Sequence, residues 1–418
     1  MGEWQAALAW WKYAIMPFMS GIVGWFTNVL ALEMTFKPIE YKGVNWFRIK
    51  DQPWGLFGWQ GIIPSKAEKM ADTTITLMTS KLFKLEDLFA KLDPEKFYEA
   101  AEDGLLLLVD DIVQETAMHH MPSSWYYIPA AVKNEIILSA NRACPQFLSA
   151  FIADMQANIN SVLDIRDMCI KICVENKEKV NKVFTEVGAK EFAFIRQSGF
   201  YFGFLFGCIQ VAIFIFYNQN WILPVFGFAV GWCTNIMALK VIFKPIKPVE
   251  VCGKFRLQGL FLKRQNEVAE SFARVNCVEL LDTETMWDFI LHGPNKARFQ
   301  ALLRAHSIVF TEKLIGGLRP FAVAAMGTEG FAKMKEDVAE KVIEKIGEIL
   351  PLTYDYTTKA LALEETIRTS MQNLSPEEFE AVLHPAFEED EMTLVFVGGF
   401  LGMLVGILQI FMFPQIAP

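Results

Sequence analysis

Three long stretches without a charged residue constrain the fold of this chain more than any other feature. Residues 13–32, 197–239 and 392–418 contain no Asp, Glu, Lys or Arg. A helix that crosses the hydrocarbon core of a bilayer needs about 20 apolar residues, so the first and third stretches can each form one span. The middle stretch is long enough for two spans, with Asn218-Gln219-Asn220 as the turn between them. The sequence therefore predicts an all-α integral membrane protein with transmembrane helices at about 13–34, 199–217, 221–243 and 393–413.

The predicted spans fall into two similar pairs. Gly24–Ile39 reads GWFTNVLALEMTFKPI and Gly231–Ile246 reads GWCTNIMALKVIFKPI, and the two are identical at 10 of 16 positions. The other two spans share the pattern G-x3-G-x3-G-x2-Q, at Gly199, Gly203, Gly207 and Gln210 and at Gly398, Gly402, Gly406 and Gln409. We therefore predict two parallel pseudo-repeats, residues 1–217 and 221–418, each built as a span, a long polar segment and a second span.

The glycine pattern predicts close helix packing inside the membrane. Glycines four residues apart form a stripe that lets two helix backbones approach each other, which is how helices associate where no hydrophobic force drives them. We expect the two glycine-rich spans to pack against each other or against the spans that carry Thr-Asn. A hinge or the lining of a lipid or ion path is the alternative role.

The polar segments 37–196 and 244–391 are predicted to be helical bundles. Apolar residues in Phe331–Ile349 recur every three or four positions, which is typical of an amphipathic helix, with Asp337 and Lys341 paired on its polar face. Breaks are expected at Pro145 and other prolines. Basic residues follow the first and third spans, and positive residues favour the cytoplasmic side. Both segments are therefore predicted to be cytoplasmic, with the termini outside a plasma (inner) membrane.

Composition argues against several classes of function. A net charge of −9 and a pI near 5.3 disfavour a nucleic-acid partner. The seven cysteines lack zinc-ligand spacing and are interpreted as reduced. We find no phosphate-binding loop, nucleophile elbow or HExxH motif, and therefore predict no catalytic residue and no cofactor. His119 and His120 are adjacent on a predicted helix, where neighbouring side chains point in different directions, and no Cys or carboxylate cluster accompanies them, so no metal site is predicted.

Polar residues inside the predicted spans are functional candidates by default. They are Thr27, Asn28, Glu33, Thr234, Asn235 and Lys240. The asparagines suit interhelical hydrogen bonds, or an ion site. Glu33 and Lys240 occupy equivalent positions in the two repeats, and would either pair across a pseudo-twofold axis or reach the membrane interface separately.

A basic turn follows each Thr-Asn span. Lys66 follows Gly-Ile-Ile-Pro-Ser, and Lys263 and Arg264 follow Gly-Leu-Phe-Leu. Basic charge near a helix start opposes the helix dipole, and anionic lipid attracts each basic residue by about 1 kcal/mol. We interpret these residues as a lipid head-group site. Residues that only fix membrane topology are the alternative.

Several of these motifs together resemble a known family. A Thr-Asn span that exits through Phe-x-Pro is followed by Gly-Ile-Ile-Pro-x-Lys, and Glu378–Pro385 with the acidic Glu389–Glu391 precedes a glycine-rich span. This combination is similar to the membrane family called domain of unknown function 445. The resemblance covers essentially the whole chain and implies a helical membrane protein with no established activity. The second repeat departs from the pattern, with Leu262 where Pro64 stands.

The sequence thus predicts a membrane scaffold or lipid-handling component whose partners are membrane lipids. The alternative is a small-solute or ion transporter or channel that uses the Thr-Asn spans, and an enzyme acting on lipids is third. A homo-oligomer is possible. A transporter should arrange its polar residues around a wet cavity, whereas a scaffold should pack its spans dry on glycine.

Overall fold

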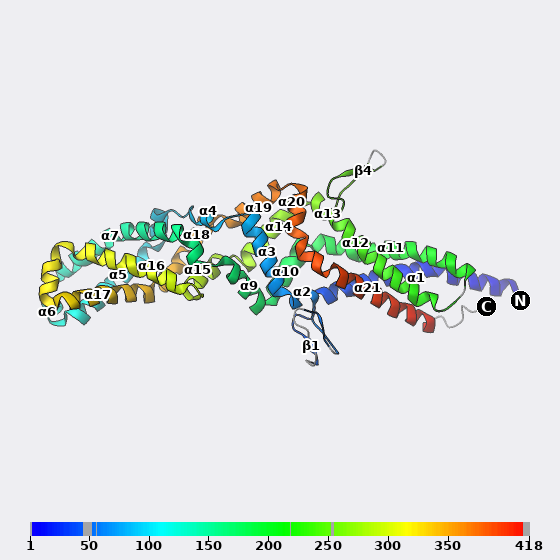
Figure 1. Ribbon diagram of the computed structural model, residues 1–418, viewed down its shortest axis with the longest axis horizontal. Helices are drawn as coiled ribbons and strands as arrows, with labels where there is room; N and C mark the ends of the chain where they lie inside the picture. The colour runs from blue at the N-terminus through cyan, green and yellow to red at the C-terminus, as the bar shows by residue number, and fades with distance from the viewer. Residues whose placement is uncertain (1, 45–51, 56, 218, 252–254, 413–418) are drawn as a thin grey trace. The chain divides into compact units, whose positions relative to one another are not determined.

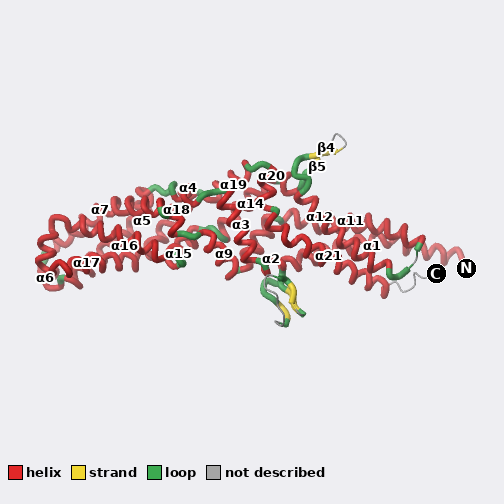
Figure 2. The backbone as a smooth tube through the Cα atoms, viewed as in Figure 1, coloured by secondary structure: helices red, strands yellow, loops and turns green. Residues whose placement is uncertain are grey.

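The computed structural model describes the backbone of residues 2–44, 52–55, 57–217, 219–251 and 255–412. Side chains are described for the same residues except 2–13, 214, 251, 255–256, 385–391 and 411–412. Almost all of the described chain is helical, and the strands are confined to two small loops (Figure 2). The chain forms two compact units, each assembled from separate segments of the sequence.

Unit 1 comprises residues 1–78, 170–279 and 367–418. Its long helices are α1, α11, α12 and α21, which run side by side in Figure 1. The elements that lie wholly or partly in this unit are α1 (Gly2–Phe36), β1 (Lys42–Gly43), β2 (Trp54–Gly55), β3 (Gly58–Trp59), α2 (Ile62–Ser65), α3 (Ala67–Lys81), α9 (Ile165–Glu175), α10 (Lys177–Val187), α11 (Ala189–Phe216), α12 (Ile222–Phe243), β4 (Val249–Val251), β5 (Phe255–Leu257), α13 (Leu260–Lys263), α14 (Gln265–Glu279), α19 (Leu363–Asn373), α20 (Pro376–Leu383) and α21 (Pro385–Met412).

Two antiparallel helix pairs form the long part of unit 1, and glycine lies at both contacts. Between α1 and α11, a Cβ placed on Gly24 would lie 2.3 Å from the carbonyl oxygen of Gly199. Between α12 and α21, a Cβ on Gly231 would lie 2.2 Å from the carbonyl oxygen of Gly398, and one on Gly402 would lie 2.1 Å from that of Gly227. Real Cβ atoms do not approach so closely, so only glycine permits these backbones to touch. Each glycine-rich helix thus packs against a Thr-Asn helix.

The chain leaves α1 and α12 through similar loops. In the first, the Gly61 amide donates to the Pro38 carbonyl at 2.8 Å; in the second, the Gly259 amide donates to Pro245 at 3.0 Å. The side-chain amide of Gln60 donates to the Ile39 carbonyl at 2.7 Å. Short antiparallel strands cover both loops, with β3 between β1 and β2 in the first and β4 paired with β5 in the second. The sequence did not predict these strands, because none is longer than three residues.

Unit 2 comprises residues 79–169 and 280–366. Helices α5, α7, α16 and α17 form a ring in which α5 contacts α7, α7 contacts α16, α16 contacts α17, and α17 contacts α5. The elements that lie wholly in this unit are α4 (Leu85–Phe89), α5 (Pro94–His120), α6 (Pro122–Tyr127), α7 (Ala130–Ala157), α8 (Ile159–Val162), α15 (Thr283–His292), α16 (Lys296–Ile315), η1 (Gly316–Leu318), α17 (Arg319–Ile349), η2 (Leu350–Thr353) and α18 (Tyr354–Leu361).

Local sequence explains where these helices begin and bend. Asp93 caps α5 by accepting a hydrogen bond from the Glu95 amide at 2.9 Å, with Pro94 in the first turn. Asp282 caps α15 in the same way. Gly327 has φ of 78° and interrupts α17, which is a conformation that side chains other than glycine rarely adopt. Pro145 lies inside α7, which continues through it, so the predicted break there was wrong.

Five helices within the described residues are long and apolar enough to cross a membrane. They are Ala14–Phe36, Ala130–Ala157, Ala189–Ile213, Ile222–Phe243 and Met392–Ile410. Four of these coincide with the predicted spans. The fifth is α7, which belongs to the ring of unit 2. The compact units also cut across the two predicted halves, 1–217 and 221–418, because each unit takes segments from both.

Candidate functional site

A cavity of about 600 Å³ lies within the helix ring of unit 2. Its volume is in the range of small-molecule sites, about 300–1,000 Å³. Side chains from α5, α6, α7, α16, η1 and α17 line it, and most of these are Leu, Ile, Val, Phe, Met or Ala. Glu135 is the one charged residue among those that line it. The cavity therefore suits an apolar ligand.

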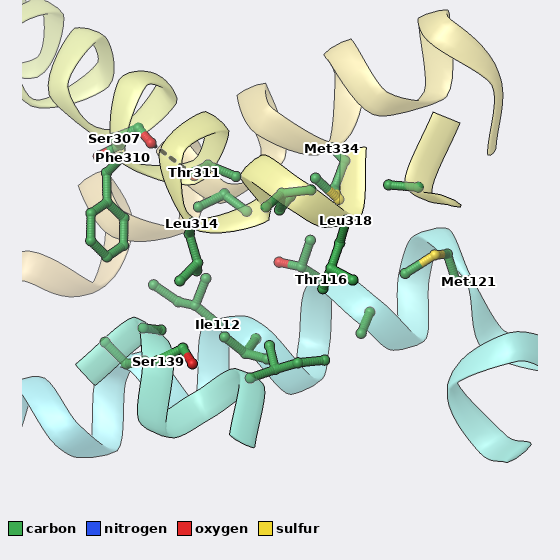
Figure 3. Close-up of a pocket in the computed structure, with 18 of the residues that line it drawn as sticks. Ile112, Thr116, Met121, Ser139, Ser307, Phe310, Thr311, Leu314, Leu318 and Met334 are labelled. Carbon is green, nitrogen blue, oxygen red and sulfur yellow. Dashed lines mark hydrogen bonds between the residues drawn. The ribbon is translucent and has the colours of Figure 1, made fainter. Parts of the chain in front are cut away.

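The lining of the cavity extends along much of α5. Along α5 it extends from Leu105 to Met121, which is about 24 Å at 1.5 Å per helical residue. Figure 3 shows Leu314 and Leu318 pointing toward α5, where Ile112 and Thr116 lie. The lining is therefore long enough to contact an extended apolar chain.

Two buried hydroxyl groups in the lining have no hydrogen-bond partner. They are Thr116 Oγ1 and Ser307 Oγ, whose residues are 5% and 1% exposed. The neighbouring Thr311 hydroxyl donates to the Ser307 carbonyl at 2.8 Å, as the dashed line in Figure 3 marks. An unpaired buried hydroxyl costs about 1–3 kcal/mol. A ligand that carries an oxygen atom near one end of its apolar chain would relieve that cost.

Large apolar side chains are exposed where the cavity lining reaches the surface of unit 2. Leu318 and Phe321 belong to the lining, yet they are 53% and 74% exposed. Tyr126 and Tyr127 of α6 are exposed as well, and Figure 1 places α6 and the start of α17 at the same end of this unit. Exposed apolar side chains therefore border the cavity at this end of the unit.

The polar residues of the Thr-Asn helices are buried at the glycine contacts of unit 1. Asn28 Nδ2 donates to the Ile195 carbonyl at 2.7 Å, and Asn235 Nδ2 donates to Leu394 at 2.9 Å. The hydroxyl groups of Thr27 and Thr234 each donate to a glycine carbonyl three residues earlier, at 3.1 and 3.2 Å. The Oδ1 atoms of both asparagines are buried without a partner. The asparagine hydrogen bonds therefore join two helices, whereas the threonine hydrogen bonds lie within one helix.

The two glutamines of the glycine pattern differ. Gln210 is buried and accepts a hydrogen bond from Ser20 at 3.0 Å, through its Oε1 atom. Gln409 is half-buried. Gly203 and Gly207 lie against the backbone of Ser20 and Pro17, and Gly406 against that of Leu223. The residue that aligns with Ser20 in the second pattern is Gly227, which has no side chain to donate.

Glu33 and Lys240 do not pair with each other within the described part of the chain. Glu33 Oε2 lies 3.1 Å from Lys37 Nζ on the same helix, and both side chains are largely exposed. Lys240 lies with Lys244 and Pro245 around a shallow pocket at the end of α12. Glu33 thus has its partner on its own helix rather than across a pseudo-twofold axis.

The basic turns contain a buried ion pair. Arg264 Nη1 lies 2.5 Å from Oε1 of Glu191, whose side chain is 1% exposed. Arg264 Nε and Nη2 both donate to Glu267 Oε2 at 3.0 Å. Hydrogen bonds from Lys190, at 2.6 Å, and from Arg264 hold the pKa of Glu267 below its usual value. Two carboxylates therefore occupy the guanidinium group, and an arginine in this state is a structural residue rather than a ready head-group site.

The two lysines of the basic turns have different surroundings. Lys66 caps the C-terminal end of α2 and is half-buried, at the position equivalent to Arg264. Lys263 is the last residue of α13 and is exposed. The structure thus separates the predicted head-group residues into one structural arginine and two lysines, and the lipid-binding role of the lysines stays a prediction.

Unit 2 brings a carboxylate to the two adjacent histidines. Asp337 of α17 lies 2.6 Å from His120 Nε2 and 3.9 Å from His119 Nε2. The expectation that no carboxylate accompanies these histidines was therefore wrong, since Asp337 is far away in sequence. The predicted Asp337–Lys341 pair was wrong as well, because Lys341 binds Glu115 of α5 instead.

All six cysteines that the structure describes are free, and Cys252 lies outside the described residues. Burial raises the pKa of the Cys173 thiol to about 12. Such a thiol is inert, because the thiolate is the reactive form. The acidic residues 388–391 lie among those whose side chains are not described.

The sequence did not predict the cavity, because its lining residues have the pattern of an ordinary buried helix face. Leu108, Ile112 and Thr116 recur at helical spacing, which indicates burial but not whether the space between helices is filled. One signal was present: Ser139, Ser307 and Thr311 interrupt otherwise apolar helix faces with small polar residues.

Comparisons with known proteins support a membrane location. The UPF0754 membrane protein alr5253 of Nostoc sp. is 22% identical to this chain over 443 residues, which cover 97% of each protein. The UPF0754 membrane protein BCG9842_B4423 of Bacillus cereus is 24% identical over 137 residues, 32% of this chain and 34% of the relative. No family model matches the chain and no solved structure matches it. The chain is thus an all-α membrane protein, and the resemblance to domain of unknown function 445 stays a prediction.

Proposed function

We propose that this protein is a membrane-anchored lipid-handling component that holds one acyl chain of a lipid in the cavity of unit 2. The observation that carries the proposal is the apolar cavity of about 600 Å³ that extends along α5, with its unpaired hydroxyl groups at Thr116 and Ser307. Burial contributes about 0.8 kcal/mol for each methylene group, so a long chain gains substantially from such a site. The oxygen of an acyl ester or acid would accept from one of the hydroxyl groups.

The membrane anchor of this proposal consists of four spans. α7 is the fifth helix of sufficient length, but it carries Lys133, Glu135, Arg142 and Asp154. Arg142 Nη1 pairs with Glu135 at 3.3 Å, and both side chains are more than 60% exposed. Charged groups on the lipid-facing surface of a span are costly, so we assign α7 to the helical module outside the membrane. The basic residues after α1 and α12 favour a cytoplasmic module, with both termini outside a plasma membrane.

An internal duplication is also part of the proposal. The equivalent hydrogen bonds of Asn28 and Asn235, and the equivalent loops at Gly61 and Gly259, support two copies of one unit. Transport through the Thr-Asn helices is the second candidate function, favoured by the unpaired Oδ1 atoms of the two asparagines. It is the weaker candidate, because their amide groups serve the dry contact between helix backbones.

The test is native mass spectrometry of the full chain extracted gently from its membrane, with identification of retained lipid. We compare the wild type with Ala140→Phe, which fills the cavity at a residue that is 1% exposed. Leu107→Phe on α5 is the matched control, because Leu107 is 74% exposed and does not line the cavity. We expect about one lipid per chain in the wild type and control, and a loss of at least about tenfold in Ala140→Phe.

Thermal unfolding checks that each variant is folded, and Ser139→Leu provides a milder filling variant if Ala140→Phe is not. Equal lipid content in a folded cavity-filled variant would overturn the proposal. A third variant, with Lys66 and Lys263 changed to Ala, separates the cavity from the basic turns. Lipid that is lost only in this variant would move the site to the turns.

A further inference from the structure

We propose that His119, His120 and Asp337 form a binding site for a divalent transition-metal ion such as Zn²⁺. Their donor atoms, two imidazole nitrogens and one carboxylate oxygen, all lie within 4.8 Å of one another. The histidines end α5 and the aspartate comes from the middle of α17, so the site joins two helices of one ring. This inference is independent of the lipid proposal.

The donor distances bracket those of a tetrahedral site. Metal bonds of about 2.0–2.2 Å in a tetrahedron place two donors about 3.3 Å apart. The Asp337 Oδ2 atom lies 2.6 Å from His120 Nε2 and 3.9 Å from His119 Nε2. Each of these two distances changes by well under 1 Å when an ion enters. The two imidazole nitrogens lie within 4.8 Å of each other and approach by up to about 1.5 Å, which rotation of the His119 side chain provides. Two nitrogen donors and one oxygen donor are a set that Zn²⁺ accepts with a water in the fourth position.

The end of the helix explains how two adjacent histidines can share one ion. His120 is the last residue of α5, and Met121 leaves the helix with φ of −140°. The two imidazole rings lie 4.8 Å apart, nearly perpendicular to each other. His120 is held firmly, with 9% of its side chain exposed, whereas His119 is 67% exposed and free to turn toward the ion. One ligand is thus preorganised and the other adapts.

The electrostatic surroundings favour a cation. The C-terminal end of α5 carries the negative end of the helix dipole, which attracts positive charge. On α17, Lys341 is bound to Glu115, and Lys345 is bound to Asp111 and Glu115 at 2.9 and 3.0 Å. Both lysines are therefore neutralised by α5. Asp337 is 25% exposed and supplies the negative charge of the site.

A plain histidine–aspartate ion pair is the alternative reading, and the chain offers internal controls for it. His306 Nε2 lies 3.0 Å from Asp154, and His292 Nδ1 lies 2.9 Å from Asp288. These pairs match the His120–Asp337 pair in chemistry, but each has a single imidazole. Only the cluster on α5 and α17 has three donors among the residues that the structure describes. The second imidazole, that of His119, therefore separates a metal site from an ion pair.

The experiment measures binding of Zn²⁺ and Co²⁺ to the full-length protein in detergent. Equilibrium dialysis gives the stoichiometry and affinity, and the visible absorption of Co²⁺ reports tetrahedral coordination. The variants are His119→Ala, His120→Ala and Asp337→Asn, and the controls are His306→Ala and His292→Ala. We expect one ion per chain in the wild type and both controls. Each site variant is expected to bind at least about tenfold more weakly, and to lose the Co²⁺ absorption.

His119→Ala is the decisive variant, because its exposed side chain can be removed without disturbing the core. Binding that is unchanged in folded His119→Ala and His120→Ala would overturn the proposal. So would binding that falls equally in His306→Ala, because that result indicates nonspecific association with surface histidines. A wild type that binds neither ion would leave the cluster as an ion pair and equally overturn it.

Discussion

The two compact units pack their helices in opposite ways. In unit 1 the helices meet backbone to backbone at Gly227, Gly231, Gly398 and Gly402, with no space for even one added carbon atom. In unit 2 the helices are held apart by Leu, Phe and Met side chains, and a cavity of about 600 Å³ remains between them. Packing on glycine leaves no room for a ligand, whereas packing on large side chains at a ring of four helices does. The comparison directs the search for ligands to unit 2.

The largest expected effect tests the glycine packing. Gly402→Leu should prevent recovery of folded protein, because even the Cβ atom would lie 2.1 Å from the Gly227 carbonyl oxygen. Gly402→Ala should still lower the melting temperature. Gly347→Ala in α17 is the control, since its Cβ would meet only Leu291, at 3.6 Å, and alanine favours a helix. The measurement is thermal unfolding in detergent, and a Gly402→Ala protein as stable as the control would remove the contrast between the units.

The next effect tests the ion pair buried in unit 1. Arg264→Ala should lower the free energy of unfolding by about 3–5 kcal/mol, because it leaves the carboxylate of Glu191 buried without a partner. The second change Glu191→Gln removes that charge and should restore part of the loss. Unfolding of the two single variants and the double variant measures the coupling. Additive losses would show that the two residues do not act as a pair.

Asn28 and Asn235 of unit 1 should each contribute less to the free energy of unfolding than the Arg264–Glu191 pair, and their two contributions should be equal. Asn28→Ala and Asn235→Ala each remove one hydrogen bond to a helix carbonyl, at a cost of about 0.6–1.7 kcal/mol. Equal losses in thermal unfolding would sharpen the equivalence of the two helix pairs. A folded Asn28→Ala protein that has lost its cellular function, with its lipid content intact, would instead favour transport.

A smaller change in the free energy of unfolding, of opposite sign in two variants, tests the cavity. Thr116 and Thr311 both line it and both are 5% exposed, but only the Thr311 hydroxyl has a partner. Thr116→Val should stabilise ligand-free protein by about 1 kcal/mol, since it removes an unpaired buried hydroxyl. Thr311→Val should destabilise it by a similar amount. If a bound lipid already accepts a hydrogen bond from Thr116, Thr116→Val should stabilise the protein only after the lipid has been removed.

The smallest effect concerns the thiol of Cys173. Its pKa is raised from 9.0 to about 12 by burial, so the folded thiol stays neutral while the unfolded one ionises above pH 9. Ionisation of the unfolded chain then favours unfolding, and stability should fall as pH rises from about 9 to 12. Cys173→Ala should show a shallower loss over this window in chemical unfolding. An identical slope in the two proteins would indicate a thiol that is not buried.

The long helices were predictable because a charge-free stretch or a strict apolar spacing has few other outcomes. The four predicted spans coincide with the apolar parts of α1, α11, α12 and α21. In lipid no water is available to hydrogen-bond the backbone, and a helix satisfies all of these groups within one segment. Pro145 was misjudged because tertiary packing in α7 outweighs one proline.

The sites were less predictable than the helices because they depend on distant residues. His120 and Asp337 are separated by 217 positions, and Arg264 and Glu191 by 73. No local pattern indicates such a pairing. Asp337 and Lys341 have the spacing of a helical ion pair, yet both bind residues of α5 instead. The cavity is the space between four helices, which no single helix encodes.

The segmented composition of unit 2 has a consequence for synthesis. The chain passes between the two units four times, and α5 and α7 are separated from α16 and α17 by the spans α11 and α12. About 140 residues lie between the end of α7 and the start of α16. At 5–20 residues per second, the ribosome needs roughly 7–28 seconds to make them. For that time α5 and α7 have each other but lack α16 and α17, so the apolar faces that later line the cavity stay exposed until the other half of the ring is made.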